Sequence, residues 1–192
     1  MNLFIYRHGS HLVFLLLYVD DIILTENDSA FTASIIQLLT STLDLKDLGL
    51  LHYFLGLQIE YTGLFVHQTK YATDLLTKFA MTDCKPCKTP CSPNQHLLPN
   101  DSPPLSDPSS YRSLVGALQY LTFTRTNLSF AIQKACQYMS NPTRNHLQAS
   151  KHILRYIRGT LYYGLAFTNS FPPLSAYCDA NWASDSIAFS IQ

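Results

Sequence analysis

The sequence predicts an α+β protein in which β-strands come first and α-helices follow. Apolar runs with the length and alternation typical of strands are confined to about the first 80 residues. From residue 108 to residue 160 the apolar residues instead recur at helical spacing. The stretch between them is rich in Pro, Ser and Asn, which is typical of an extended linker. These shifts divide the chain into residues 1–81, 82–107, 108–160 and 161–192.

The first expected element is a β-hairpin that carries two adjacent carboxylates on its turn. Two runs of strand-forming residues, 12–17 and 22–24, flank Tyr18-Val19-Asp20-Asp21. A transmembrane helix over this region would be too short to cross the hydrocarbon core and would hold both Asp residues near its centre. A signal peptide is excluded because the apolar run is broken early and no small-residue cleavage site follows. We therefore expect an intracellular protein with no membrane partner.

Asp20 and Asp21 are candidate metal ligands. Burying unpaired carboxylates is costly, so a cation is expected to offset that cost. Carboxylate oxygens suit Mg²⁺, which takes one or two protein carboxylates and leaves its other positions to water and phosphate. The same ligands serve two-metal phosphoryl transfer. An ordinary surface hairpin with an acidic turn explains this tetrapeptide equally well.

The rest of the first section is expected to hold a helix, a second hairpin and another helix. The first helix covers residues 29–43, with four apolar residues on one side: Ile35, Ile36, Leu38 and Leu39. In the hairpin, residues 57–60 alternate, Thr62-Gly63 makes the turn, and residues 64–66 return. Thr69 is expected to cap the last helix, which packs Leu75, Leu76 and Phe79.

Three helices are expected after the linker. Asp107 is placed as an N-cap before Pro108, and this helix continues to about residue 122. Asn127 is expected to cap a second helix that ends near Met139. Residues 141–143 introduce a third helix, which stops before Gly159. Helices joined by such short connections form a compact bundle.

The charges are distributed unevenly although the formal net charge is zero. Residues 108–178 contain seven Lys or Arg residues and no Asp or Glu. Successive residues of a helix are ~100° apart, and four of these cations fall within an arc of about 60° on the third helix. We call them the basic side: Arg144, Lys151, Arg155 and Arg158. The apolar residues lie opposite: Leu147, Ala149, Ile153, Leu154, Tyr156 and Ile157. The basic side indicates contact with nucleic-acid phosphates, and the alternative is an ordinary solvated face. His146 and His152 are interpreted as bystanders to this contact.

The five cysteines do not indicate a disulfide scaffold. Their number is odd and no secretory signal accompanies them, which favours a reducing compartment. Cys84, Cys87, Cys91 and His96 have the density of metal ligands, but their spacing matches no zinc pattern and prolines interrupt it. We interpret them as incidental residues of the linker.

A series of sequence blocks carries a family resemblance. They begin with Tyr18-Val19-Asp20-Asp21 after its apolar strand and continue in a fixed order. The later blocks are residues 45–49, 53–57, 68–71, 111–122, 153–160 and 177–183. This ordered series, which extends through nearly the whole chain, resembles the reverse transcriptase of copia-type LTR retrotransposon Pol polyproteins.

The resemblance implies an RNA-directed DNA polymerase that extends a primer with deoxynucleoside triphosphates. Asp20 and Asp21 would be its catalytic metal ligands for Mg²⁺, or for Mn²⁺, with Asp20 the direct ligand. The nucleic-acid partner would be a primer-template duplex of RNA or DNA. Three residues resemble the primer grip: Leu55, Gly56 and Leu57. Tyr18 and the basic side would contact the duplex.

The resemblance also assigns the four sections. They would be a polymerase palm fragment, a linker, a three-helix thumb-like bundle, and a truncated start of a ribonuclease H domain with a vestigial Asp179. Two family features are missing from the sequence, an upstream metal-binding Asp and a fingers subdomain. Asn181 also stands where the family often has Asp. We therefore expect a fragment that is inactive alone; the alternatives are a noncatalytic nucleic-acid-binding remnant and a structural or interaction protein.

Overall fold

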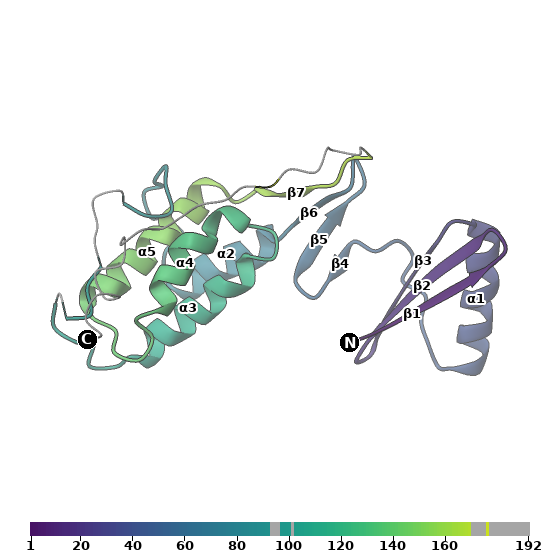
Figure 1. Ribbon diagram of the computed structural model, residues 1–192, viewed down its shortest axis with the longest axis horizontal. Helices are drawn as coiled ribbons and strands as arrows, with labels where there is room; N and C mark the ends of the chain where they lie inside the picture. Colours follow the sequence, from purple (N-terminus) through teal and green to yellow (C-terminus); the bar gives the residue numbers. More distant parts are fainter. Residues whose placement is uncertain (93–96, 101, 170–175, 177–192) are drawn as a thin grey trace.

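The computed structural model describes residues 1–92, 97–100, 102–169 and 176. In this part of the chain two antiparallel β-sheets and five α-helices occur, so the predicted α+β class is confirmed. Figure 1 shows the first sheet and its helix to one side of the other elements, joined to them by a stretch of chain without regular structure. No helix among the described residues is both long and apolar enough to cross a membrane.

The first sheet has the strand order β1 (Asn2–His8), β2 (His11–Tyr18) and β3 (Asp21–Glu26). The pairing of β2 with β3 confirms the predicted acidic hairpin. Helix α1 (Ser29–Thr42) follows, and the side chain of Asp28 caps it by accepting hydrogen bonds from the backbone N–H groups of Ala30 and Phe31.

Phe31 of α1 lies on the first sheet. Its ring stacks on Tyr6 and on His11, with centroids 6.1 and 4.9 Å apart. Farther along α1, Ile35, Ile36 and Leu39 are half-buried, as their spacing predicts. Leu38 is 65 % exposed, so its assignment to the packed side was wrong.

The second sheet has the order β4 (Tyr53–Phe54), β5 (Leu57–Glu60), β6 (Phe65–His67) and β7 (Gly164–Ala166). The β5–β6 hairpin was predicted. The pairing of β7 with β6 was not predicted, because residues from 161 onward were assigned to a separate section of the chain. Gly164 is required at this position, because a Cβ there would overlap the carbonyl oxygen of Val66 and lie 2.8 Å from the Cβ of His67.

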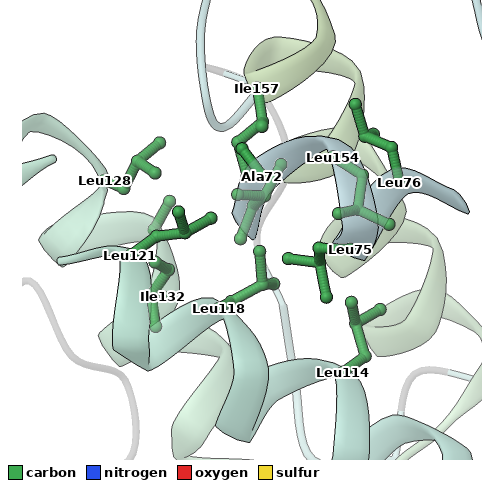
Figure 2. Close-up of a cluster of buried hydrophobic side chains, with 12 residues drawn as sticks. Ala72, Leu75, Leu76, Leu114, Leu118, Leu121, Leu128, Ile132, Leu154 and Ile157 are labelled. Carbon is green, nitrogen blue, oxygen red and sulfur yellow. The ribbon is translucent and has the colours of Figure 1, made fainter. Parts of the chain in front are cut away.

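Four helices share one hydrophobic core, which Figure 2 shows. They are α2 (Thr69–Lys78), α3 (Ser109–Leu121), α4 (Ser129–Cys136) and α5 (Arg144–Gly159). Residues from each helix are almost fully buried, among them Leu76, Leu118, Ile132 and Leu154. Each such side chain contributes about 1.5–3 kcal/mol through its removal from water. The predicted three-helix bundle therefore includes α2 as a fourth helix.

The starts of α2 and α4 correct two predictions. Gln68, not Thr69, is the N-cap of α2, and the hydroxyl of Thr69 donates to the carbonyl of Leu161 instead. Asn127 lies within the 3₁₀ turn Thr126–Leu128 and does not cap α4, which ends at Cys136. His146 is fully buried, away from the basic side, and forms a capping box with the N-cap residue of α5, Thr143.

The N-cap of α3 is Pro108, one residue after the predicted Asp107, although Asp107 does bond the first turn. Asp107 Oδ1 accepts a hydrogen bond from the backbone N–H of Ser109 at 2.9 Å, and Pro108 already has helical dihedral angles. Asp107 therefore satisfies a free N–H group of the first turn, as an N-cap side chain does.

Residues 82–92 lie along α5 and do not extend away from the bundle. Arg155 Nε donates to the carbonyl of Lys85 at 2.8 Å, and Arg158 Nε donates to the carbonyl of Thr82 at 2.7 Å. The thiol of Cys87 donates to the carbonyl of His152. The prediction of an extended linker was therefore wrong for this part, although it does lack helices and strands as its composition indicated.

Candidate functional site: two turns beside the helical bundle

The acidic turn joins β2 to β3 through two residues, Val19 and Asp20. Tyr18 pairs with Asp21 across its base. Val19 has a φ of 50°, a left-handed conformation that is rarely adopted by a β-branched residue. Such strain occurs in proteins mainly where a site needs a particular backbone geometry.

Asp20 and Asp21 are both exposed on this turn. Within the residues that the structure describes, neither carboxylate has an ion-pair partner. Because neither carboxylate is buried, no cation is needed to offset a cost of burial, and that expectation was wrong. Two exposed, unpaired carboxylates still fit the one or two protein ligands that Mg²⁺ takes. No cluster of three or more acidic, His or Cys residues suited to a metal occurs in the described ranges.

A second turn joins β4 to β5 through Leu55 and Gly56. Phe54 pairs with Leu57 across its base. Leu55 has a φ of 47° and Gly56 a φ of 76°, so both central residues are left-handed, as a type I′ hairpin turn requires. Glycine suits position 56 because it adopts this positive φ without strain.

The residues next to the two turns are in contact. The rings of Tyr18 and Phe54 lie edge to face, with centroids 6.2 Å apart. On the second turn, the hydroxyl of Tyr120 from α3 donates to the carbonyl oxygen of Leu55. Burial raises the pKa of Tyr120, and the nearby phenols of Tyr53 and Tyr18 raise it further. Tyr120 is therefore a neutral hydrogen-bond donor near pH 7.

The basic side of α5 is divided between two environments. Arg144 and Lys151 are exposed to solvent. Arg155 and Arg158 hold residues 82–85 through the hydrogen bonds described above. The four residues do share one side of the helix, as predicted, but two of them also have a structural role that the sequence did not indicate.

Arg125, one of the seven cations between residues 108 and 178, is 2 % exposed. Its guanidinium donates to the carbonyl and the hydroxyl of Thr160, at 2.9 and 2.7 Å. It also lies 5.2 Å from the ring centroid of Tyr163 and 5.8 Å from that of Tyr156. Burial lowers the pKa of Arg125. This cation therefore joins the end of α5 to the 3₁₀ turn instead of facing a ligand.

Two residues singled out in the sequence, Asp179 and His96, lie outside the described residues. Asp179, the vestigial ribonuclease H residue, lies in the range 177–192, which the structure does not describe. His96 also lies outside the described residues, whereas Cys84, Cys87 and Cys91 are half-buried. Burial raises the pKa of Cys87, which makes its thiolate less available.

Comparison with known proteins decides the family. The family model for reverse transcriptase (RNA-dependent DNA polymerase) matches residues 1–93. The Retrovirus-related Pol polyprotein from transposon RE1 of Arabidopsis thaliana is 41% identical over 96% of this chain and 13% of its own length. An uncharacterized mitochondrial protein of Arabidopsis thaliana is 45% identical over 89% of this chain and 72% of its own length. The chain belongs to the copia-type reverse transcriptase family.

The resemblance seen in the sequence blocks is thereby confirmed. The matched range of the reverse transcriptase family contains both turns. A further member, the Pol polyprotein from transposon TNT 1-94 of Nicotiana tabacum, is 34% identical over 92% of this chain and 14% of its own length. The chain thus spans 13% to 14% of these polyproteins. No solved structure matches it.

Proposed function

We propose that this chain is the part of a copia-type reverse transcriptase that runs from the metal-binding turn of the palm to the thumb. The contact between Tyr18 and Phe54 carries the proposal, because it brings the acidic turn next to the Leu55–Gly56 turn. In a primer-extending enzyme the metal ligands and the element that steadies the primer end must be neighbours. The helical bundle, which carries the basic side, contacts the second turn through Tyr120.

Each element has a distinct role in this proposal. Asp20 and Asp21 hold Mg²⁺, or Mn²⁺ in its place, with Asp20 the direct ligand. The bound ion supplies charge stabilisation for phosphoryl transfer to a deoxynucleotide. Leu55, Gly56 and Leu57 steady the 3′ end of the primer, and Tyr18 contacts its backbone. The exposed cations of α5 hold the phosphates of the primer-template duplex without reading its sequence.

We also propose that this chain does not polymerise alone. Two-metal phosphoryl transfer uses a clamp of carboxylates around both ions. Asp20 and Asp21 are two such ligands, and the described residues place no third acidic side chain with them. The remaining ligands would come from other sequence of the intact enzyme, of which this chain corresponds to a small share.

The metal-binding role is tested by titrating the chain with Mn²⁺ and following the water proton relaxation rate. Asp20→Asn removes one carboxylate charge from the turn and should weaken Mn²⁺ binding about tenfold or more, because charged oxygen ligands dominate the affinity of such sites. Asp74→Asn is the matched control, since Asp74 is an exposed carboxylate of α2 far from both turns in the sequence. Equal Mn²⁺ affinity in wild type and Asp20→Asn would rule out this role.

Nucleic-acid binding is tested by the salt dependence of duplex affinity. Arg144→Glu/Lys151→Glu should flatten the slope of log K against log salt by about two units, at about 0.9 per phosphate contact. Arg7→Glu/Lys46→Glu makes the same change in net charge away from α5 and should have a smaller effect. An equal effect of both pairs would mean that only net charge matters.

The two titrations together separate the alternatives. Duplex binding without Mn²⁺ binding at the acidic turn favours a noncatalytic nucleic-acid-binding remnant. The absence of both favours a structural or interaction protein. Both activities, each lost in its own variant, support the polymerase assignment.

A further inference from the structure

The Leu55–Gly56 turn has a conformation that its own sequence does not fully support. Both residues are left-handed, which suits Gly56 but is unfavourable for Leu55. Type I′ turns prefer Asn, Asp or Gly at the first of these positions. A contact outside the hairpin is therefore needed to hold this turn in one conformation.

Tyr120 of α3 provides that contact in two ways. Its hydroxyl donates to the carbonyl oxygen of Leu55. Its ring covers Gly56, where an added Cβ would lie 3.2 Å from Tyr120 Cε1 and 3.4 Å from its hydroxyl oxygen. A side chain at position 56 would therefore force Tyr120 to shift by a few tenths of an ångström, as well as strain the backbone.

Tyr120 is itself held firmly. Gln68, which is 2 % exposed, donates from its side chain to the carbonyl of Tyr120 at 3.3 Å and accepts from the hydroxyl of Thr124 at 2.9 Å. The ring of Tyr71 lies edge to face with that of Tyr120, with centroids 5.0 Å apart. The hydroxyl of Tyr71 donates to the carbonyl of Ala117, also in α3. Tyr120 thus extends from a fixed point on the bundle to the turn.

We propose that Tyr120 is a positioning residue that fixes the Leu55–Gly56 turn against α3 and, through the contact of Phe54 with Tyr18, fixes the acidic turn relative to the bundle. Its importance for primer placement rests on the function proposed above. Its effect on the two turns does not, because it follows from contacts within this chain. The two parts can therefore be tested separately.

The first test compares Tyr120→Phe with Tyr71→Phe by hydrogen exchange and mass spectrometry of the full chain. Each variant loses one phenol hydroxyl that donates to a backbone carbonyl, and each keeps its ring. Tyr120→Phe should speed exchange in residues 53–60 about 3- to 10-fold, which corresponds to one lost hydrogen bond. Tyr71→Phe keeps the ring that packs on Tyr120 and the hydrogen bond from Tyr120 to Leu55, so it should speed exchange in that segment less than about twofold. Unchanged exchange of residues 53–60 in Tyr120→Phe would overturn the proposal.

A rescue variant distinguishes positioning from a general loss of stability. Leu55→Asn places a residue that tolerates the left-handed conformation in the turn. Combined with Tyr120→Phe, it should return the exchange of residues 53–60 at least halfway to the wild-type rate. If residues 53–60 of the double variant exchange as fast as in Tyr120→Phe while the bundle exchanges as in wild type, Tyr120 does not act through the conformation of Leu55.

The second test places 2-aminopurine at the 3′ end of the primer in a primer-template duplex. Tyr120→Phe should keep duplex affinity within about twofold of wild type, because the phosphate contacts lie elsewhere. It should, however, remove most of the fluorescence change that wild type produces at the primer end. If the exchange result holds and wild type produces no fluorescence change, the proposed function fails and the internal role of Tyr120 stands. A wild-type fluorescence change that persists in Tyr120→Phe excludes its role in primer placement.

Discussion

At the scale of single residues, the sequence located the acidic turn but not its conformation. Strand-forming runs on both sides of Asp20 and Asp21 leave little choice but a turn between them. The left-handed φ of Val19 had no local signal, because valine is not a residue of such turns. The burial of Arg125 was also missed, since counting charges treats every cation as exposed. Only the long-range partners Thr160 and Tyr163 explain it.

A buried phenol gives a prediction about stability at high pH. Tyr111 is fully buried, its hydroxyl donates to the carbonyl of Ala135 at 2.7 Å, and burial raises the pKa of Tyr111 to about 12. The ordinary value is about 10, so the unfolded chain loses this proton first as the pH rises. The protonated phenol of Tyr111 therefore makes its full contribution to the free energy of unfolding below pH ~10, and this contribution is lost as the pH rises toward ~12.

Tyr111→Phe should accordingly be less stable than wild type by about 1 kcal/mol at pH 8, because the carbonyl of Ala135 loses its donor. Above pH ~10 the difference should shrink by up to about 1.4 kcal/mol per pH unit. Urea unfolding at pH 8 and at pH 11 measures both values. A difference that stays constant with pH would contradict the assigned pKa.

At the scale of elements, periodicity predicted the helices better than it predicted their ends. The spacing of apolar residues placed α1, α2, α3 and α5 within a few residues of their observed bounds. The predicted N-caps were wrong where the side chain forms a hydrogen bond with a residue distant in sequence. Thr69 bonds Leu161, and the amide of Asn127 donates to the hydroxyl of Tyr156. Composition likewise predicted the lack of regular structure after residue 81, but not the contacts with α5.

Those contacts predict how the cysteines near residue 85 react. Arg158→Met removes the donor to the carbonyl of Thr82 and keeps an apolar side chain of similar length. The segment should then detach more often, and Cys84 and Cys87 should react about 2- to 5-fold faster with a thiol reagent, which corresponds to part of one hydrogen bond to a charged group. Lys151→Met is the control, because Lys151 is exposed on the same helix.

Mass spectrometry resolves the labelling rate of each cysteine. Equal rates in wild type and both variants would mean that Arg158 does not hold the segment. Faster labelling in Lys151→Met as well would point to a general loosening of α5.

At the scale of the whole molecule, the division of the chain into sections was less accurate than the fold class. Helix α2 precedes the linker in sequence, yet Ala72, Leu75 and Leu76 lie in the same core as α3, α4 and α5 (Figure 2). A boundary at residue 81 therefore separates residues that pack together. No local sequence pattern indicates that α2 packs with the later helices, because the shared core depends on contacts between residues far apart in sequence.

The whole-molecule prediction concerns activity. The purified chain should not extend a primer with either Mg²⁺ or Mn²⁺, because a turn with two carboxylates does not provide the full ligand set for two ions. Incorporation of labelled deoxynucleotide into a primer-template duplex measures this directly. Incorporation that persists on repurification and is lost in Asp20→Asn would show that the site is complete.

The pairing of β6 with β7 has a consequence for how the chain folds. His67 lies opposite Gly164, so forming this pair closes a loop of about 100 residues. The entropic penalty of closing such a loop is roughly 4 kcal/mol. Packing of α2 on α5 already closes most of the same loop, because these two helices are almost as far apart in sequence. Contacts this distant in sequence form late and slow the overall rate. The α2–α5 contact should therefore be the slow step in refolding, and β7 should dock onto β6 soon after it.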